Sequence, residues 1–177
     1  MTAQAIPRRG RGVQPADGTG PLPVADWDEV CAVLRRGEVG PFWLSIVRDD
    51  DSSPHVRPVF AAWGGSSFFI ASKSSAAKTR HLNRHPHATI SVDLGKVHLT
   101  VEGAVTRVTG ADRLGLASKA MQEVFSWPTV VAGDELDADY GAPTSGGPPY
   151  QVYELVPVRA YAFPTADQVQ PTRWIFD

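Results

Sequence analysis

The sequence predicts a mainly β protein, an antiparallel barrel accompanied by a few helices. About six or seven β-rich runs follow one another at hairpin spacing, separated by turn clusters rich in Gly, Pro, Asp and Ser. Only a few segments show the periodicity of an amphipathic helix. The chain has 177 residues, which suits one domain with a substantial core.

The N-terminal part divides into an arm and the start of a domain. Residues 1–25 are rich in Gly, Pro, Arg and Ala without periodicity, which predicts a flexible arm ahead of a domain over residues 26–177. The domain opens with an amphipathic helix, because Asp26 is suited to cap its first turn and Gly37 to end it.

Strand signals follow in series. Three β-rich runs separated by turn clusters predict a meander over residues 42–48, 55–63 and 67–72. A short helix over "KTRHLNRHP" comes next and is closed by Pro86. Two strands joined by a tight turn are then expected over residues 88–94 and 97–108.

The second half contains the one substantial helix. Apolar residues at helical spacing predict it over residues 111–125. The long connection 126–149 exceeds the usual loop length, so we expect it to be functional, interface-covering or mobile. Strands are expected over residues 150–164, where Pro157 indicates a bulge or an edge, and over 172–177.

Composition excludes several classes of protein. Hydrophobic residues make up 42% and charged residues 20% of the chain, as in ordinary globular proteins. The formal net charge is −2, whereas a dedicated nucleic-acid binder is clearly basic. The chain has one cysteine and no run of about 18 apolar residues, so neither an internal disulfide nor a membrane-spanning helix is expected. We therefore expect a cytoplasmic protein that binds neither nucleic acid nor membrane.

Residues 74–87, "SSAAKTRHLNRHPH", have the composition of an anion-binding helix start. Ser and Thr hydroxyls, free backbone N–H groups and the helix dipole all favour a phosphate at such a position. Lys78 adds a point charge and Arg80 a planar guanidinium. Arg57 lies on the same strand face as His55, and it reaches the same anion if its strand pairs with residues 67–72.

This segment has two other interpretations. The basic side chains, including Arg84, can simply form a solvated helix face. His81 and His85 share a face at i, i+4, but a zinc site normally has a third protein ligand, and a metalloprotease helix has Glu where this chain has Leu82. No metal site is therefore expected.

The chain lacks the common motifs of side-chain catalysis. It contains no G-x-S-x-G elbow, Walker loop or dinucleotide-binding glycine turn. Cys31 lies on the first predicted helix, where a small core residue is the simpler interpretation than a nucleophile. An enzyme of this sequence would therefore take its chemistry from a cofactor.

Several ordered segments together resemble the pyridoxamine 5'-phosphate oxidase-like, FMN-binding split β-barrel superfamily. They are "PHVRPVFAAW", "SFFIASKSSAAKTRHLNRHPHATISV", "LTVEGAVTRV" and "YELVPVRAYAFPTADQVQPTRWIFD", and they span roughly residues 26–177. The resemblance implies a split antiparallel β-barrel that forms a homodimer, with the cofactor in a cleft at the dimer interface. The superfamily includes FMN oxidases and deazaflavin-dependent oxidoreductases.

The resemblance also implies the residues that hold the cofactor. Arg57 matches a phosphate-contacting strand position, and the next three residues would run beneath the ring. The full set is Arg57, Pro58, Val59, Phe60, Ser72, Lys73, Ser75, Lys78, Thr79, Arg173 and Trp174. Trp174, in the C-terminal "TRW" motif, is equally suited to core packing. Glu102 and Gly103 match a "VEG" strand signature, in which the glycine allows a close approach.

The function implied is an oxidoreductase that uses FMN or coenzyme F420, with FMN preferred, and transfers a hydride to or from a small organic substrate. No catalytic side chain is assigned, although His55 and Tyr140 are weak candidates as proton donors. The last thirty residues lack the Arg-x-His arrangement of the pyridoxamine phosphate oxidases, so vitamin B6 oxidation is not expected. The alternatives are a flavin carrier or sensor without turnover, and a structural dimer without cofactor.

Overall fold

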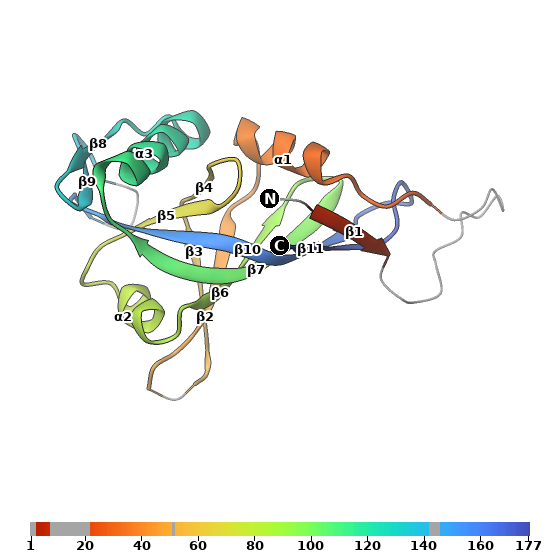
Figure 1. Ribbon diagram of the computed structural model, residues 1–177, viewed down its shortest axis with the longest axis horizontal. Helices are drawn as coiled ribbons and strands as arrows, with labels where there is room; N and C mark the ends of the chain where they lie inside the picture. Colours follow the sequence, from red (N-terminus) through yellow and green to blue (C-terminus); the bar gives the residue numbers. More distant parts are fainter. Residues whose placement is uncertain (1–2, 8–21, 51, 142–145) are drawn as a thin grey trace.

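Long antiparallel strands form the body of the protein in this computed structural model, which describes residues 3–7, 22–50, 52–141 and 146–177 (Figure 1). The main sheet is built from β1 (Ala3–Pro7), β2 (Phe42–Val47), β3 (Pro54–Val59), β4 (Ala61–Trp63), β5 (Phe68–Ser72), β6 (His87–Asp93), β7 (Val97–Val108), β10 (Gln151–Pro164) and β11 (Thr172–Phe176). A separate hairpin consists of β8 (Thr129–Ala132) and β9 (Glu135–Ala138). The mainly β class predicted from the sequence is confirmed.

The strands close into a split antiparallel barrel. Their order is β1-β11-β10-β7-β6-β2-β3, while β4 pairs with β5, which in turn pairs with the first half of β10. The expected continuous strand 55–63 is divided at Phe60, because β3 pairs with β2 whereas β4 pairs with β5. The sequence-based meander is therefore wrong in one respect, since only the β4 part of this strand reaches β5. β3 is the last strand of the main order and does not pair with β5, and this missing pairing is the split of the barrel.

In the described residues, three helices accompany the barrel: α1 (Trp27–Arg36), α2 (Ala77–Arg84) and α3 (Ala111–Phe125). As predicted, the Asp26 side chain caps α1 by accepting from the backbone N–H groups of Asp28 and Glu29, and Gly37 ends it with φ 69°. Helices α1 and α3 lie on one side of the long strands and α2 on the other (Figure 1). Helix α2 thus stands apart, next to the split edge.

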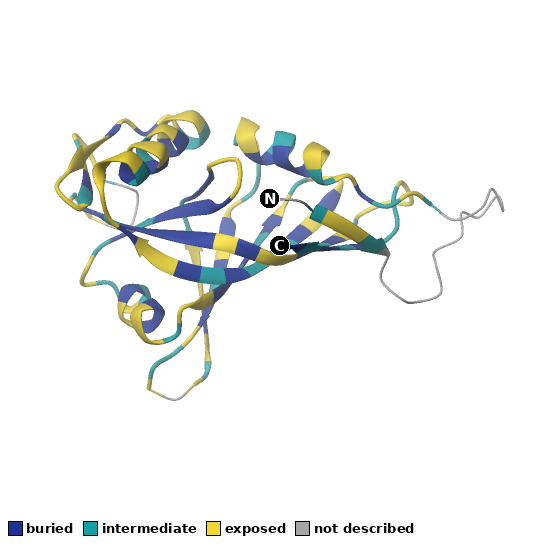
Figure 2. Ribbon diagram, viewed as in Figure 1, coloured by how far each residue is buried: buried dark blue, intermediate teal, exposed yellow. Residues whose placement is uncertain are grey.

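The two longest strands, β7 and β10, pair along their length (Figure 2). Buried and less buried residues alternate along most of β7, whereas β10 has four consecutive buried residues near its start, 152–155. The pairing shifts between Pro157 and Arg159, which confirms the bulge predicted at the proline. Gly103 lies opposite Pro157, and a Cβ on it would come within 2.1 Å of the Val156 carbonyl oxygen. The close approach expected at this glycine is therefore an approach of the β10 backbone.

The core has two parts. The larger part fills the barrel beneath α1, where the Trp27 ring packs against Trp63, Trp174 and Phe176. The smaller part lies between α3 and the sheet and includes Trp127. Cys31 is buried in the larger part, and burial raises the pKa of its thiol to about 11, which agrees with a small core residue.

Two segments expected to be irregular contain strands. Residues 3–7 of the expected arm pair with β11. Without this pairing, the outer backbone groups of β11 would be unpaired. Residues 8–21 of the expected arm lie outside the described residues. The expected connection 126–149 contains the β8–β9 hairpin, because a β-branched run meets a turn at Gly133. In the described part of the chain, no helix is both long and apolar enough to cross a membrane.

Candidate functional site

The turn between β5 and α2 is held by buried hydroxyl groups. The oxygen atoms of Ser72 and Thr79 lie 2.9 Å apart, and Thr79 also donates to the Lys73 carbonyl at 2.8 Å. Both side chains are buried. The Tyr153 hydroxyl, on β10, lies 3.2 Å from the Asn83 amide oxygen and so joins α2 to the sheet. These hydroxyls therefore fix the position of α2.

The N-terminus of α2 remains open at the surface of this turn. Its cap residue is Ala76, whose side chain offers no hydrogen bond, so the first backbone N–H groups are not capped by a side chain. Ser75, one position earlier, is exposed. Lys73 points elsewhere, since its ammonium group donates to the Gly147 carbonyl at 2.7 Å and lies 5.6 Å from the Tyr150 ring centre. Lys73 thus links the turn to the segment before β10.

Arg57 lies on β3, the edge strand next to the split. It pairs with Leu44, whose side chain is buried, so Arg57 is on the sheet face that carries the core. The Arg57 side chain is nevertheless exposed, because no described strand pairs with β3 on its outer edge. Its guanidinium donates only to the Val56 carbonyl, at 2.8 Å, among the described residues. An inward-facing arginine at an open edge is available to a ligand.

The three residues after Arg57 form the rest of this edge. Pro58 is exposed, Val59 is half-buried, and Phe60 packs its ring against Phe125 at 4.7 Å between ring centres. Phe60 is the residue at which the strand passes from β3 to β4. The Phe60 side chain is therefore packed against the smaller part of the core. The groups that this edge exposes to solvent are mainly those of the backbone.

Lys78 supplies a second positive charge near Arg57. Its side chain is half-buried, and burial lowers the pKa of its ammonium group. Arg57 and Lys78 are both close enough to His55 to lower the pKa of its imidazole. Within the described ranges, no carboxylate forms an ion pair with either of them. Two cations without a carboxylate partner among the described residues therefore lie in the surroundings of His55, and one of them, Lys78, belongs to the first turn of α2.

His81 of α2, considered from the sequence only as a metal ligand, instead joins α2 to the turn after β2. His81 is buried, and its Nδ1 lies 2.7 Å from a carboxylate oxygen of Asp49, in the turn after β2. Burial raises the pKa of the Asp49 carboxyl, but the His81 hydrogen bond and the positive charge of Arg80 outweigh it, and the net pKa is lowered. Arg80 and Arg84 reach the same carboxylate from outside, at 3.3 and 3.7 Å. His81 and Asp49 are far apart in the sequence, so the sequence pattern did not predict their contact.

The C-terminal residues of the predicted set lie elsewhere in the sheet. Trp174 is buried on β11, with its ring centre 5.1 Å from that of Trp27. Arg173 is half-buried and pairs with Tyr161 of β10. Four strands, β10, β7, β6 and β2, separate β11 from β3 in the sheet order. Within one chain, these two residues are therefore not brought together with Arg57 and Lys78.

The opposite face of the sheet carries an open pocket of about 540 Å³. Its lining includes Ser45, Thr89, Glu102 and Arg159, which are cross-strand neighbours, and Arg159 lies 3.9 Å from Glu102. Exposed apolar side chains surround it on the same strands: Trp43, Val47, Val56, Val156 and Val158. No three His, Cys, Asp or Glu side chains of the described chain are grouped to hold a metal ion.

The sequence comparison gives one family, and the structural comparisons give a similar fold. Residues 28–163 match the sequence model described as Pyridoxamine 5'-phosphate oxidase. The fold is similar to that of a pyridoxamine 5'-phosphate oxidase-related, FMN binding protein from Nostoc punctiforme, at 16% identity and a TM-score of 0.51, over 87% of this chain and 98% of that one. No curated protein is significantly similar in sequence.

Two further structures extend the comparison. A conserved hypothetical protein from Mycobacterium tuberculosis is 15% identical with a TM-score of 0.60, over 85% of this chain and 89% of that one. A NimC/NimA family protein from Clostridium acetobutylicum is 14% identical with a TM-score of 0.55, over 86% and 95% respectively. At such identities the likeness concerns the fold alone.

Proposed function

The chain belongs to the pyridoxamine 5'-phosphate oxidase family, and on that premise we propose that it binds FMN, or alternatively coenzyme F420, and acts as an oxidoreductase on a small organic substrate. Residues 26–177 form the cofactor-binding unit. Hydride transfer is the chemistry that either cofactor supplies when bound. FMN is preferred because the FMN binding protein from Nostoc punctiforme shares the fold.

The pair Arg57 and Lys78 carries the proposal. A half-buried ammonium group without a carboxylate partner is costly, and a bound anion removes that cost. The uncapped N-terminus of α2 favours a negative charge at the same place. A phosphate group therefore fits the charge of this site, with Arg57 and Lys78 as its ligands and Ser75 at its rim.

The remaining residues of the predicted set have supporting roles. Ser72 and Thr79 bond to each other, so they position the turn. The Lys73 ammonium group donates to the Gly147 carbonyl, so Lys73 forms part of the wall of the site. The unpaired edge of β3 at Pro58 and Val59, together with Phe60 after it, can offer C=O groups and the N–H groups of Val59 and Phe60 to the polar rim of a planar ring. The chain thus binds and orients the cofactor, and excludes water from one side of it.

A homodimer completes the site in this proposal. The exposed apolar side chains around Trp43, Val47 and Val158 form a surface that a second copy of the chain would cover. Arg173 and Trp174 are separated from Arg57 by four strands, so Arg173 can contribute to the cleft only from the partner copy. A cleft between two barrels also gives the substrate access beside the cofactor.

The ligand released from the purified full-length protein tests this function. The protein is produced in cells that make both cofactors, and the ligand is released and identified by absorbance and mass. FMN or coenzyme F420 at about one per chain supports the proposal, and turnover with reductant and small acceptors tests the enzyme activity. Bound cofactor without turnover would favour a carrier or sensor, and no binding even on titration would contradict the proposal.

A further inference from the structure

His55 is a buried histidine whose ring is not fully satisfied. It lies on β3 two residues before Arg57, so the two side chains leave the same face of the strand. Its side chain is 6% exposed, and its Nδ1 has no hydrogen-bond partner among the described residues. Its ring meets that of His81 edge-on, with 5.0 Å between ring centres. Such an unpaired buried nitrogen needs an explanation.

The groups around His55 are mainly cationic. They come from its own strand, from the end of β2 and from α2, and they are Arg57, Arg48, Lys78 and His81. Asp49, the carboxylate that contacts His81, lies 2.7 Å from its Nδ1 and also pairs with Arg80 and Arg84. The charged groups that act on His55 are therefore positive, and the carboxylate of Asp49 is already engaged.

This arrangement disfavours a proton on the His55 imidazole when no anion is present. Burial lowers the pKa of His55, and the charges of Arg57, His81, Arg48 and Lys78 lower it further. An anion between Arg57 and Lys78 would cancel much of this positive field. A proton on Nδ1 would also give the ring a donor, for which an anion oxygen is a suitable acceptor.

We propose that anion binding at the Arg57–Lys78 site is coupled to the uptake of one proton by His55, so that the site holds a doubly charged anion more tightly as the pH falls. This inference rests on the proposed function, because it needs an anion at that site. Affinity rises as the pH falls through the pKa of His55 in the complex, and levels off below its pKa in the free protein.

Inorganic sulfate is the probe for this coupling. The charge of a phosphate monoester changes in this pH range because its second pKa is about 6, whereas sulfate remains a dianion between about pH 5 and pH 8. Sulfate affinity is measured calorimetrically over that range for the full-length protein, for His55→Gln and for His98→Gln. His98 is an exposed histidine on β7 and is the matched control.

The expected result is a gain of about tenfold in sulfate affinity from high to low pH for each unit by which the anion raises the His55 pKa. His98→Gln keeps this gain and His55→Gln loses it. Binding enthalpies in buffers of different ionisation enthalpy report the proton directly in the unmodified protein, so the test does not depend on the folding of His55→Gln.

Two results would overturn the coupling alone. The first is sulfate binding without proton uptake in the unmodified protein. The second is an identical pH dependence in His55→Gln, or in Lys78→Ala, which would locate the effect elsewhere. If sulfate, FMN and coenzyme F420 all fail to bind at any pH, the proposed function fails, and this inference fails with it. The two failures are therefore distinguishable.

Discussion

The hydroxyl groups of Ser72 and Thr79 lie 2.9 Å apart and join the last residue of β5 to the first turn of α2. Each hydroxyl is buried, and the Thr79 hydroxyl donates a hydrogen bond to the Lys73 carbonyl. The pair therefore fixes the helix that presents Lys78, although neither hydroxyl is free to contact a ligand. The position of the cationic site depends on this link.

Replacing Thr79 by Val should destabilise the protein by about 1–3 kcal/mol, because the shape is kept while the Ser72 hydroxyl and the Lys73 carbonyl lose a buried partner. Chemical denaturation measures the free energy of unfolding. Thr106→Val, at an exposed position of β7, is the control and should change it by less than about 0.5 kcal/mol. Equal stability of the two variants would show that the hydroxyl link is dispensable.

Removing the two uncompensated cations should weaken cofactor binding without unfolding the protein. Arg57→Ala and Lys78→Ala should each raise the Kd for FMN by about tenfold or more, since each loses a charge-assisted contact of about 1.5–3 kcal/mol. Fluorescence titration measures this, and riboflavin, which lacks the phosphate, should bind all variants alike.

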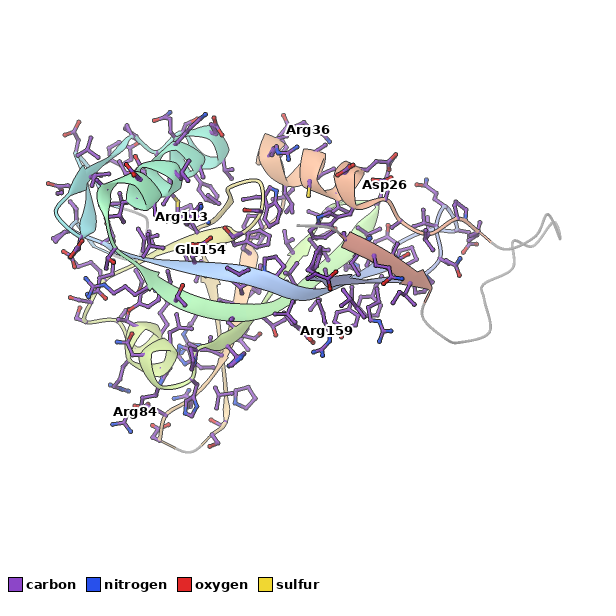
Figure 3. All side chains as sticks on the ribbon, in the orientation of Figure 1. Asp26, Arg36, Arg84, Arg113, Glu154 and Arg159 are labelled. Carbon is purple, nitrogen blue, oxygen red and sulfur yellow. The ribbon has the colours of Figure 1, made fainter. Side chains whose placement is uncertain are left out.

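Arg36→Ala is the matched control for those variants. Arg36 carries the same charge on α1, on the side of the barrel opposite α2 (Figures 1 and 3). The control should leave the Kd for FMN within about twofold of its original value. An unchanged Kd in both Arg57→Ala and Lys78→Ala would contradict the assignment of the phosphate site.

Much of the fold follows from local sequence signals. The bounds of α3 and β7 equal the predicted ones, because each segment has a strong period and clear breakers at its ends. The division of strand 55–63 at Phe60 was not predicted, since the run is continuously β-forming and only pairing partners reveal the break. Local pattern determines the elements, but the split is a property of their pairing.

The candidate site was less accessible to sequence reasoning. Arg57 and Lys78 were predicted from residue type and position, and the structure brings both to the surroundings of His55. The roles of Thr79 and His81 depend on contacts with Ser72 and Asp49, which pattern alone cannot foresee. Burial decides these roles, because it turns a hydroxyl or a ring nitrogen from a possible ligand into a satisfied internal group.

The Arg113–Glu154 pair should give the stability a pH dependence. Arg113 of α3 and Glu154 of β10 point toward each other (Figure 3), and Arg113 Nε lies 3.0 Å from the carboxylate. Burial raises the pKa of Glu154, but hydrogen bonds from Arg113 and Ser67 outweigh it, so the net pKa lies below the ordinary 4.5. A carboxyl with a lowered pKa stabilises the fold above 4.5, and this contribution is lost as the pH falls through the folded-state value.

Arg113→Ala should therefore cost about 1–3 kcal/mol at neutral pH, less than a fully buried pair because the Arg113 side chain is 42% exposed. The difference from the unmodified protein should narrow below about pH 4.5, where Glu154 becomes protonated. Urea denaturation at several pH values measures it. Lys119→Ala breaks an exposed pair on the same helix and should cost less than about 0.5 kcal/mol at every pH. A pH-independent cost in Arg113→Ala would refute the role of the charge.

Gly103→Ala should be the most destabilising of these changes, at about 3 kcal/mol or enough to prevent folding. The added methyl group would lie 2.1 Å from the Val156 carbonyl oxygen and 2.8 Å from a Leu155 methyl group, so the β10 backbone would have to move at its bulge. Gly115 is the control, because it lies in α3 with no atom within 4 Å of the new methyl group. Gly115→Ala should stabilise the protein by about 0.5–1 kcal/mol through helix propensity. Thermal unfolding of both variants gives the comparison, and a Gly103→Ala protein as stable as Gly115→Ala would mean that β7 and β10 are not packed as closely as their pairing requires.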